Sequence, residues 1–384
     1  MSAHANPDIV TDGLAFIYDT GSGKSYKGEP TVNLTTDSPS QGGWNGSLNV
    51  LDSSTKKFRF NVSNFSGSPG QGWRSFTWDL NSYSGQSVTI SATVEVPSAS
   101  PGTFAWIMMG QGNTHTNTSG AGGYMGYSSA SERIQKTTTT TEHITWSGTV
   151  GSTGTASQPS GHVGFTVWYN DGTPSTNSYV EVSNVQIEIK SHATPFVNGT
   201  RSATQGLIDR TNNTTINLSN VSFDSNAQMV FDGTDDYTSL GNPTALRDLT
   251  SGTIETVYYR DASSGTYQMV FTDAGSDLEI TYLGNTLQFY IGNSGLSYTH
   301  AVTDQWFNVV GTWGSGFKKL YINGVEVASG TNTGTDTGNR DRYVGGRGAN
   351  FPFNGEIPIA KIYNKALTSA EVLQNYNATK GRFQ

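Results

Sequence analysis

Short runs of strand-forming residues, each ended by turn residues, fill most of this 384-residue chain. The runs are rich in Val, Ile, Thr, Tyr, Phe and Trp, and the breaks are rich in Gly, Asn, Asp and Ser. The chain has 46 Gly and 11% aromatic residues, but its 14% charged residues fall below the roughly 25% of an average globular protein. Because few segments have a helical period, the pattern predicts an all-β protein with many turns.

Charge and hydropathy exclude several classes of protein. The formal net charge of -8, with no basic run, argues against nucleic-acid binding and against binding to anionic membrane surfaces. No apolar run is long enough to span a bilayer. The absence of Cys excludes disulfides, thiolate metal sites and Cys nucleophiles. The first eight residues lack the charged and apolar regions of a signal peptide, so we expect synthesis in a cytosol.

The strands fall into two series. The first, within residues 31–197, has seven or eight strands, which is typical of a β-sandwich or jelly roll. Its Thr run at 137–141 predicts an edge strand or a solvated linker. The second series begins at residue 229, and Asn323-Gly324 is its strongest hairpin signal. Thr368 and Glu371 predict a capped C-terminal helix, with an apolar face formed by Val372, Leu373 and Tyr376.

An acidic connection interrupts the second series at its start. Residues 230–237 read VFDGTDDY, in which an apolar run enters Asp232-Gly233 and alternation resumes at Tyr237. This pattern predicts a hairpin. Asp232, Asp235 and Asp236 supply hard oxygen ligands at a spacing that suits calcium. Asp residues also cap turns, and both roles remain open. Asp336 with Asp341, and Asp273 with Asp277, are weaker versions of the same pattern.

Several motifs of the second series resemble a known family. They are VFDGTDDY at 230–237, WFNVVGTW at 306–313, LYINGVEV at 320–327 and IYNKALTSAE at 362–371. They resemble laminin-G-like, concanavalin-A-like jelly rolls, most of all the version found in bacteriophage structural proteins. In that family a leading strand closely precedes the Phe-Asp-Gly motif. The matching piece here, GLAFIYD at 13–19, lies far upstream. The resemblance therefore implies an inserted domain, with strand 14–18 pairing next to strand 359–363.

The inserted stretch resembles carbohydrate-binding-module jelly rolls. It opens with EPTVNL at 29–34 and closes with VSNVQIEI at 182–189, and the phrase ATPFVNGTR at 193–201 also resembles phage virion and tail proteins. We therefore expect two all-β jelly rolls and a short C-terminal helix. An N-terminal arm would occupy residues 1–7. The laminin-G-like jelly roll would be discontinuous, at 8–28 plus 198–384, and residues 29–197 would form the insert.

No catalytic residues are expected. Glycosidases need two carboxylates roughly 5 to 10 Å apart, and the laminarinase-type run of Glu, Asp and Glu on one strand does not occur. Glu255 has no acidic partner at that spacing, and the six His are scattered. No Gly-x-Ser-x-Gly elbow is followed by a plausible triad.

Aromatic residues are the candidates for sugar binding. A strand buries every second side chain, so the aromatic residues of the alternating strands favour the core. Trp44 and Trp73 stand in Gly-rich stretches that predict loops, and they are the preferred carbohydrate-binding residues. The wider set of candidates also contains Trp78, Trp146, Trp168 and Tyr169.

The resemblance implies a non-enzymatic phage virion surface protein, acting as a capsid decoration, a head fibre or a tail-associated adhesion protein. Its partners would be other virion proteins, host cell-surface glycans and further copies of itself, without nucleic acid or membrane insertion. It would be made in the host cytoplasm. Calcium at Asp232, Asp235 and Asp236 is the only cofactor considered. Two alternatives remain: a polysaccharide-degrading tail enzyme with an accessory binding module, and a structural cement protein without a ligand.

Overall fold

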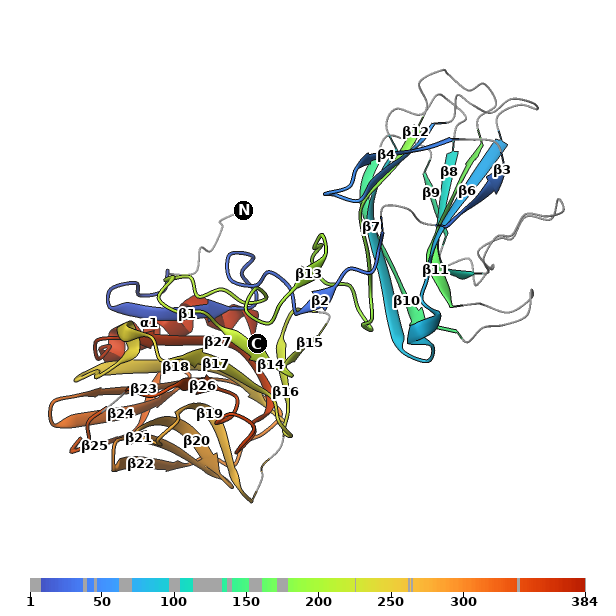
Figure 1. Ribbon diagram of the computed structural model, residues 1–384. Helices are drawn as coiled ribbons and strands as arrows, with labels where there is room; N and C mark the ends of the chain where they lie inside the picture. Colours follow the sequence, from blue (N-terminus) through green and yellow to red (C-terminus); the bar gives the residue numbers. More distant parts are fainter. Residues whose placement is uncertain are drawn as a thin grey trace. The chain divides into compact units, whose positions relative to one another are not determined.

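The chain folds into two compact units in a computed structural model (Figure 1). The structure describes residues 8–36, 40–44, 47–61, 71–96, 104–112, 133–136, 140–151, 161–170, 179–224, 226–261, 263, 265–336 and 339–383. Met1–Pro30 and Ser202–Gln384 form one unit, called the split unit here, and Thr31–Arg201 form the inserted unit. Both consist mainly of antiparallel strands, which confirms the expected all-β class. No helix among the described residues is long and apolar enough to cross a membrane.

The split unit has two large sheets. The eight-stranded sheet contains β1 (Leu14–Asp19), β15 (Ser222–Phe223), β16 (Met229–Asp232), β18 (Gly252–Arg260), β23 (Trp306–Gly314), β24 (Phe317–Ile322), β25 (Val325–Gly330) and β27 (Asn354–Tyr363). The seven-stranded sheet contains β14 (Asn217–Ser219), β17 (Tyr237–Gly241), β19 (Tyr267–Asp273), β20 (Leu278–Leu283), β21 (Thr286–Ile291), β22 (Ser294–Thr299) and β26 (Arg342–Val344). The short helices are η4 (Thr244–Leu246), α1 (Ser369–Thr379) and η5 (Lys380–Arg382).

The main apolar core of the split unit draws buried side chains from both sheets, including Phe16, Phe231, Phe289 and Trp313. A second, smaller cluster brings β23, β24 and β27 together with Val10 of the N-terminal segment and Val372 of α1. The eight-stranded sheet is therefore covered on both faces. This explains why β18 and β27 are buried along almost their whole length rather than at every second residue.

Strand β1 joins the sheet only through β27. Their antiparallel register places Phe16 opposite Ile362 and Asp19 opposite Ile359, which confirms the predicted pairing (Figure 1). β27 pairs with β16 through residues 354–356 and with β1 through residues 359–363, along the same side. Pro358 lies between these two partners, where its missing N–H removes no ladder bond.

The outer edge of β1 is closed by the segment that follows the insert. Asp209 is buried, and its carboxylate accepts backbone N–H bonds from Ile17 (3.1 Å), Thr211 (3.0 Å), Asn213 (3.0 Å) and Thr214 (3.1 Å). The N–H of residue 210 donates in turn to the carbonyl oxygen of Ile17 (3.0 Å). Because an open edge strand invites pairing with other chains, this segment both protects β1 and joins the two halves of the unit.

The inserted unit is a sandwich of two five-stranded sheets. One contains β10 (Thr140–Thr149), β7 (Ser87–Val96), β12 (Tyr179–Glu188), β5 (Lys57–Asn61) and β4 (Ser47–Asp52), in that order. The other contains β3 (Ser40–Trp44), β6 (Gln71–Asp79), β11 (His162–Asn170), β8 (Phe104–Gly112) and β9 (Arg133–Lys136). η2 spans Asn81–Tyr83. Phe58, Phe76 and Phe165 meet in a core built from both sheets.

A two-stranded ladder closes the inserted unit at its ends. β2 (Thr31–Val32) pairs antiparallel with β13 (Thr200–Arg201), so the first and last residues of the unit lie side by side. The carboxylate of buried Glu188 lies near this ladder and accepts hydrogen bonds from the hydroxyls of Thr31 (2.8 Å) and Thr194 (2.8 Å). The chain therefore leaves the split unit and returns to it at neighbouring points.

Local sequence signals had mixed outcomes. The Asn323-Gly324 hairpin is confirmed by the pairing of Ile322 with Val325, with a positive φ at both turn residues. The capping box of Thr368 and Glu371 is also confirmed. The apolar face predicted for α1 is wrong in part, because Leu373 is 45% exposed and the helix buries Asn375 and Thr379 beside Val372. Residues 137–139 lie outside the described part, and β10 begins at Thr140 as an edge strand.

We expect Asp209→Ala to destabilise the split unit by roughly 2–3 kcal/mol, because four backbone N–H groups lose their acceptor. Urea unfolding measures the loss, and hydrogen exchange should show faster exchange of the β1 amides. Asp12→Ala is the control, since the Asp12 carboxylate is exposed and pairs only with Lys365. Equal stability of the two variants would show that Asp209 does not hold β1.

Candidate functional site

The acidic connection lies between the two sheets of the split unit. β16 pairs with β15 and β27, whereas β17 pairs with β14 and β26, so the predicted Asp-Gly hairpin is wrong. The connection crosses from one sheet to the other instead. Gly233 has φ +77°, the Asp232 carboxylate accepts from the N–H of Thr234 (2.8 Å), and Asp236 accepts from the N–H of Asp232 (2.8 Å).

The carboxylates of Asp232, Asp235 and Asp236 approach within 4.8 Å of one another. Asp232 and Asp235 are exposed, while Asp236 is buried. Burial raises the pKa of Asp236, and the charges of Asp232 and Asp235 raise it further against the lowering effect of the Asp232 N–H. Three hard oxygen donors could hold part of a calcium coordination sphere, which takes six to eight oxygens. The hydrogen bonds of Asp232 and Asp236 to backbone N–H groups also shape the turn, so the geometry is consistent with a calcium site and with a turn-forming role.

The weaker acidic pairs are ion-pair partners. Buried Arg342 binds Asp273 (2.8 Å) and Asp336 (2.7 Å), and all three side chains are almost fully enclosed. Asp277 pairs with Arg340 (2.9 Å) instead. Because an arginine already neutralises these carboxylates, the contacts of Asp273, Asp277 and Asp336 support a structural role.

Four tryptophans occupy one register row in the inserted unit. Trp44 of β3 is opposite Trp73 of β6, Trp73 is opposite Trp168 of β11, and Trp168 is opposite Trp106 of β8. The predicted loop positions of Trp44 and Trp73 are wrong, since both residues belong to strands. The side chains at all four positions lie outside the described part of the structure.

The strand register gives the face of the sheet to which this row belongs. In β6 and β11 the tryptophan positions are three or five residues from buried core positions, and an odd separation within a strand corresponds to the opposite face of the sheet. Those core residues are Phe76, Trp78, Val163 and Phe165. The aromatic candidates predicted from the sequence did not include Trp106, and they placed Trp168 behind Trp44 and Trp73. Trp106 stands in a strand that is apolar on both faces and Trp168 in an alternating strand, so only the register reveals the row.

Glu255 is a buried structural carboxylate. It is 0% exposed, and its two oxygens accept bonds from Lys361 (2.8 Å), Asn308 (2.9 Å) and Asn375 (2.6 Å). Tyr363 bonds to the same Asn375 amide; burial raises the pKa of Tyr363, and the Glu255 charge raises it further. A substrate cannot reach Glu255 in this arrangement, which argues against a glycosidase role for this residue.

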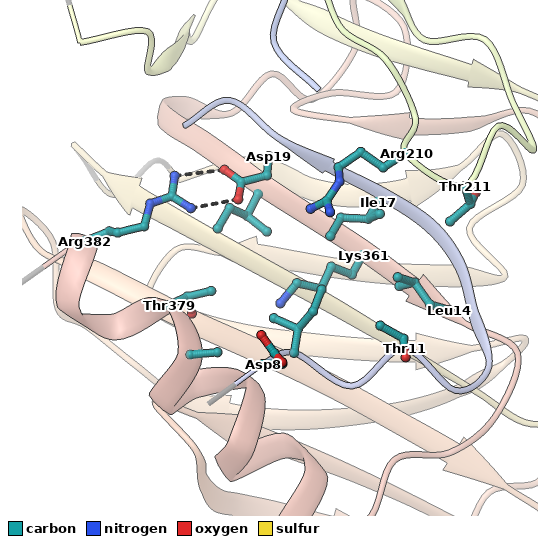
Figure 2. A pocket seen from close by; sticks show the side chains of 13 residues that line it. Asp8, Thr11, Leu14, Ile17, Asp19, Arg210, Thr211, Lys361, Thr379 and Arg382 are labelled. Carbon is teal, nitrogen blue, oxygen red and sulfur yellow. Dashed lines mark hydrogen bonds and ion pairs between the residues drawn. The ribbon is translucent and has the colours of Figure 1, made fainter. Parts of the chain in front are cut away.

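A cavity of about 700 Å³ lies on the outer side of the eight-stranded sheet, within the split unit (Figure 2). Ile17 and Leu14 of β1 and Ile359 and Lys361 of β27 line it together with the C-terminal helical turn, the segment after the insert and the N-terminal segment. Its volume is within the roughly 300–1,000 Å³ of ligand pockets. No sequence motif indicates this cavity, because its walls come from four separate parts of the chain.

Residues 232–373 match the family model of the concanavalin A-like lectin/glucanases superfamily. The match begins at Asp232 of the acidic connection and ends within α1, and it covers most of both sheets of the split unit. This part of the chain therefore has a concanavalin A-like jelly-roll fold. Together with the inserted sandwich, it confirms the expected fold. The family description combines lectins and glucanases, so it does not decide between binding and hydrolysis.

Solved structures match parts of the chain at low sequence identity. Domain 4 of an extracellular arabinanase from Geobacillus stearothermophilus, solved with arabinotriose, is 20% identical over 46% of this chain and 93% of that domain, with a TM-score of 0.37. The receptor-binding domains of botulinum neurotoxins D and G are 14% and 16% identical, with TM-scores of 0.38 and 0.39. The matches cover 47% and 45% of this chain but only 51% and 48% of those domains. No curated protein matches the chain.

The raised pKa of Asp236 leads to a pH prediction. An acid whose pKa is higher in the folded state loses stabilisation as pH rises from its unfolded pKa through its folded pKa. We expect Asp236→Asn, which cannot ionise, to gain stability relative to the natural protein across that rise. Urea unfolding between about pH 4 and pH 7 measures the difference. If the stability gained by Asp236→Asn over the natural protein falls as pH rises, that result would contradict the raised pKa of Asp236.

Calcium distinguishes the two roles of the acidic connection. A bound cation would raise the melting temperature of the natural protein, with about 2.7 kcal/mol of stabilisation at 100 times the Kd. Asp235→Asn would abolish that response, because it removes an exposed ligand and leaves the turn contacts of Asp232 and Asp236 in place. A melting temperature that is unchanged by calcium and by chelator assigns the aspartates to the turn alone.

Glu255→Gln should destabilise the split unit by about 3–5 kcal/mol, because the Lys361 ammonium group is left buried without its counter-charge. Adding Lys361→Met to this variant should recover part of the loss. Urea unfolding of both variants tests the pair. A Glu255→Gln protein of natural stability would instead mean that Glu255 is not the partner that neutralises Lys361.

Proposed function

We propose that the chain is a non-enzymatic glycan-binding protein whose principal site is the tryptophan row of the inserted unit. The register of Trp44, Trp73, Trp168 and Trp106 carries this proposal. Indole rings give large, rigid apolar faces with one polar edge, which suits the alternating apolar and hydroxylated surfaces of sugars. Positions on paired strands are also held more precisely than positions on loops.

The direction of the row suggests the ligand. Neighbouring strands lie about 4.8 Å apart, so four positions span about 14 Å across the sheet. A platform of that length favours a glycan chain lying across the strands over a single terminal sugar. The net charge of -8 disfavours polyanionic glycans, since like charges repel at long range. A neutral polysaccharide is therefore the proposed ligand class.

The proposed setting is the outside of a phage particle, as a capsid decoration, head fibre or tail-associated adhesion protein. The laminin-G-like motifs and the phrase at 193–201 support it, through their resemblance to phage structural proteins. Further copies of the chain and other virion proteins would be its neighbours, with synthesis in the host cytoplasm. Cryo-electron microscopy of intact particles tests the setting: density for two sandwiches on the outer surface is expected, and particles without such density would refute it.

Single substitutions test the tryptophan row. Trp73→Ala and Trp168→Ala should each weaken binding to a neutral polysaccharide by about tenfold to 100-fold, as measured by calorimetry on a ligand found by glycan array. Trp73→Phe should retain part of the affinity, since it keeps an aromatic face. Tyr298→Ala, which removes a partly exposed ring of the split unit, is the matched control.

Three results would overturn this function. Full affinity in both Trp73→Ala and Trp168→Ala would show that the row is not the site. Release of reducing sugar ends from the bound polysaccharide would favour the alternative of a polysaccharide-degrading enzyme. A protein that binds no glycan at all would favour the structural cement alternative.

A further inference from the structure

The cavity of the split unit has charged side chains on its walls and an apolar floor. Ile17 and Ile359 are buried beneath it, and Leu14 adds to the same surface. Three of its lining charges already have ionic partners. Arg382 makes a bidentate ion pair with Asp19, with distances of 2.7 and 2.8 Å (Figure 2). Lys361 donates to buried Glu255 (2.8 Å).

Two lining charges remain without an ionic partner among the described residues. They are the guanidinium of Arg210 and the carboxylate of Asp8, and both side chains are exposed. They come from different walls. The Arg210 N–H donates to Ile17 at the outer edge of β1 (3.0 Å), whereas the Asp8 carbonyl oxygen accepts from Gln374 of α1 (2.7 Å). In the view of Figure 2, Arg210 and Asp8 lie on either side of Lys361.

Both walls are held by hydrogen bonds, one to β1 of the sheet and the other to helix α1. The segment of Arg210 is held by the Asp209 carboxylate, and the segment of Asp8 is held by the bond from the Val10 N–H to the Asn375 side chain (2.8 Å). The two opposite charges are therefore anchored on separate supports, with an apolar floor between them. A ligand that satisfies both must carry an anionic end and a cationic end joined by an apolar body.

We propose that this cavity is a binding site for an elongated zwitterion. Its anionic end pairs with Arg210, its cationic end pairs with Asp8, and its apolar body lies over Ile17 and Ile359. Such a group occurs in free ω-amino acids and in the C-terminal lysine of a polypeptide, which share this chemistry. The site is separate from the tryptophan row, so it does not depend on the glycan-binding function.

Three probes of equal chain length test the charge pattern on the full-length protein. They are 6-aminohexanoate, hexanoate and hexylamine, with binding followed by ligand-observed NMR and calorimetry. We expect 6-aminohexanoate to bind most tightly. Arg210→Gln should weaken the binding of 6-aminohexanoate and hexanoate by about threefold to tenfold and leave the affinity for hexylamine unchanged. Asp8→Asn should weaken the binding of 6-aminohexanoate and hexylamine and leave the affinity for hexanoate unchanged.

A charge exchange and a control make the test specific. The double variant Asp8→Arg with Arg210→Asp should regain 6-aminohexanoate binding, because the ligand can reverse its direction. Lys24→Gln lowers the net charge by the same amount as Arg210→Gln but lies outside the cavity lining, and it should have no effect. The proposal fails if 6-aminohexanoate does not bind, if the three probes bind equally, or if both single variants keep the natural affinity.

A peptide ending in lysine, compared with its C-terminal amide, separates the two sources of the zwitterion. Binding of the free peptide but not of the amide supports a polypeptide terminus as ligand. Binding of 6-aminohexanoate alone supports a small ω-amino acid. If neither compound binds the natural protein, the proposal is refuted while the glycan-binding result stands independently.

Discussion

The pairing of β1 with β27 determines how the rest of the split unit can form. Phe16 and Ile362 meet across almost the whole length of the chain, and closing so long a loop costs conformational entropy. The inserted unit reduces that cost. Its own core and its closing ladder of Thr31 with Arg201 bring its two ends together, so once it is folded it acts as a short connection. Asp209, just beyond the insert, then meets β1 directly.

Buried carboxylates support this architecture, and that role limits the chemistry available to them. Asp209 satisfies backbone groups, Glu255 neutralises a lysine, and Asp273 and Asp336 enclose Arg342. Taking such groups out of water is expensive, so each needs a full set of partners to be tolerated. The same partners keep substrates away. These four carboxylates are thus committed to holding strands, turns and a helix in place.

The sequence predicted those features that depend on local chemistry or on strong resemblance. The Asn323-Gly324 turn and the Thr368 cap follow from backbone preferences, and the return of β1 to β27 followed from the displaced family motif. The prediction of a hairpin at Asp232-Gly233 was wrong, because a local turn signal cannot reveal that the next strand joins another sheet. The tryptophan row could not be predicted either. It exists only after four strands, which are far apart in the sequence, adopt one register.

The two candidate sites favour different ligands because different structural elements form them. A row across paired strands is flat and repeats at the strand spacing, so it suits a repeating ligand and gains affinity from each further ring. The cavity beside β1 is instead assembled where separate chain segments converge, and the opposite charges of Asp8 and Arg210 on its walls favour a ligand with one anionic and one cationic end. A repeating glycan has no reason to prefer the cavity, and a short zwitterion has little to gain from the row. The two surfaces can therefore be occupied independently.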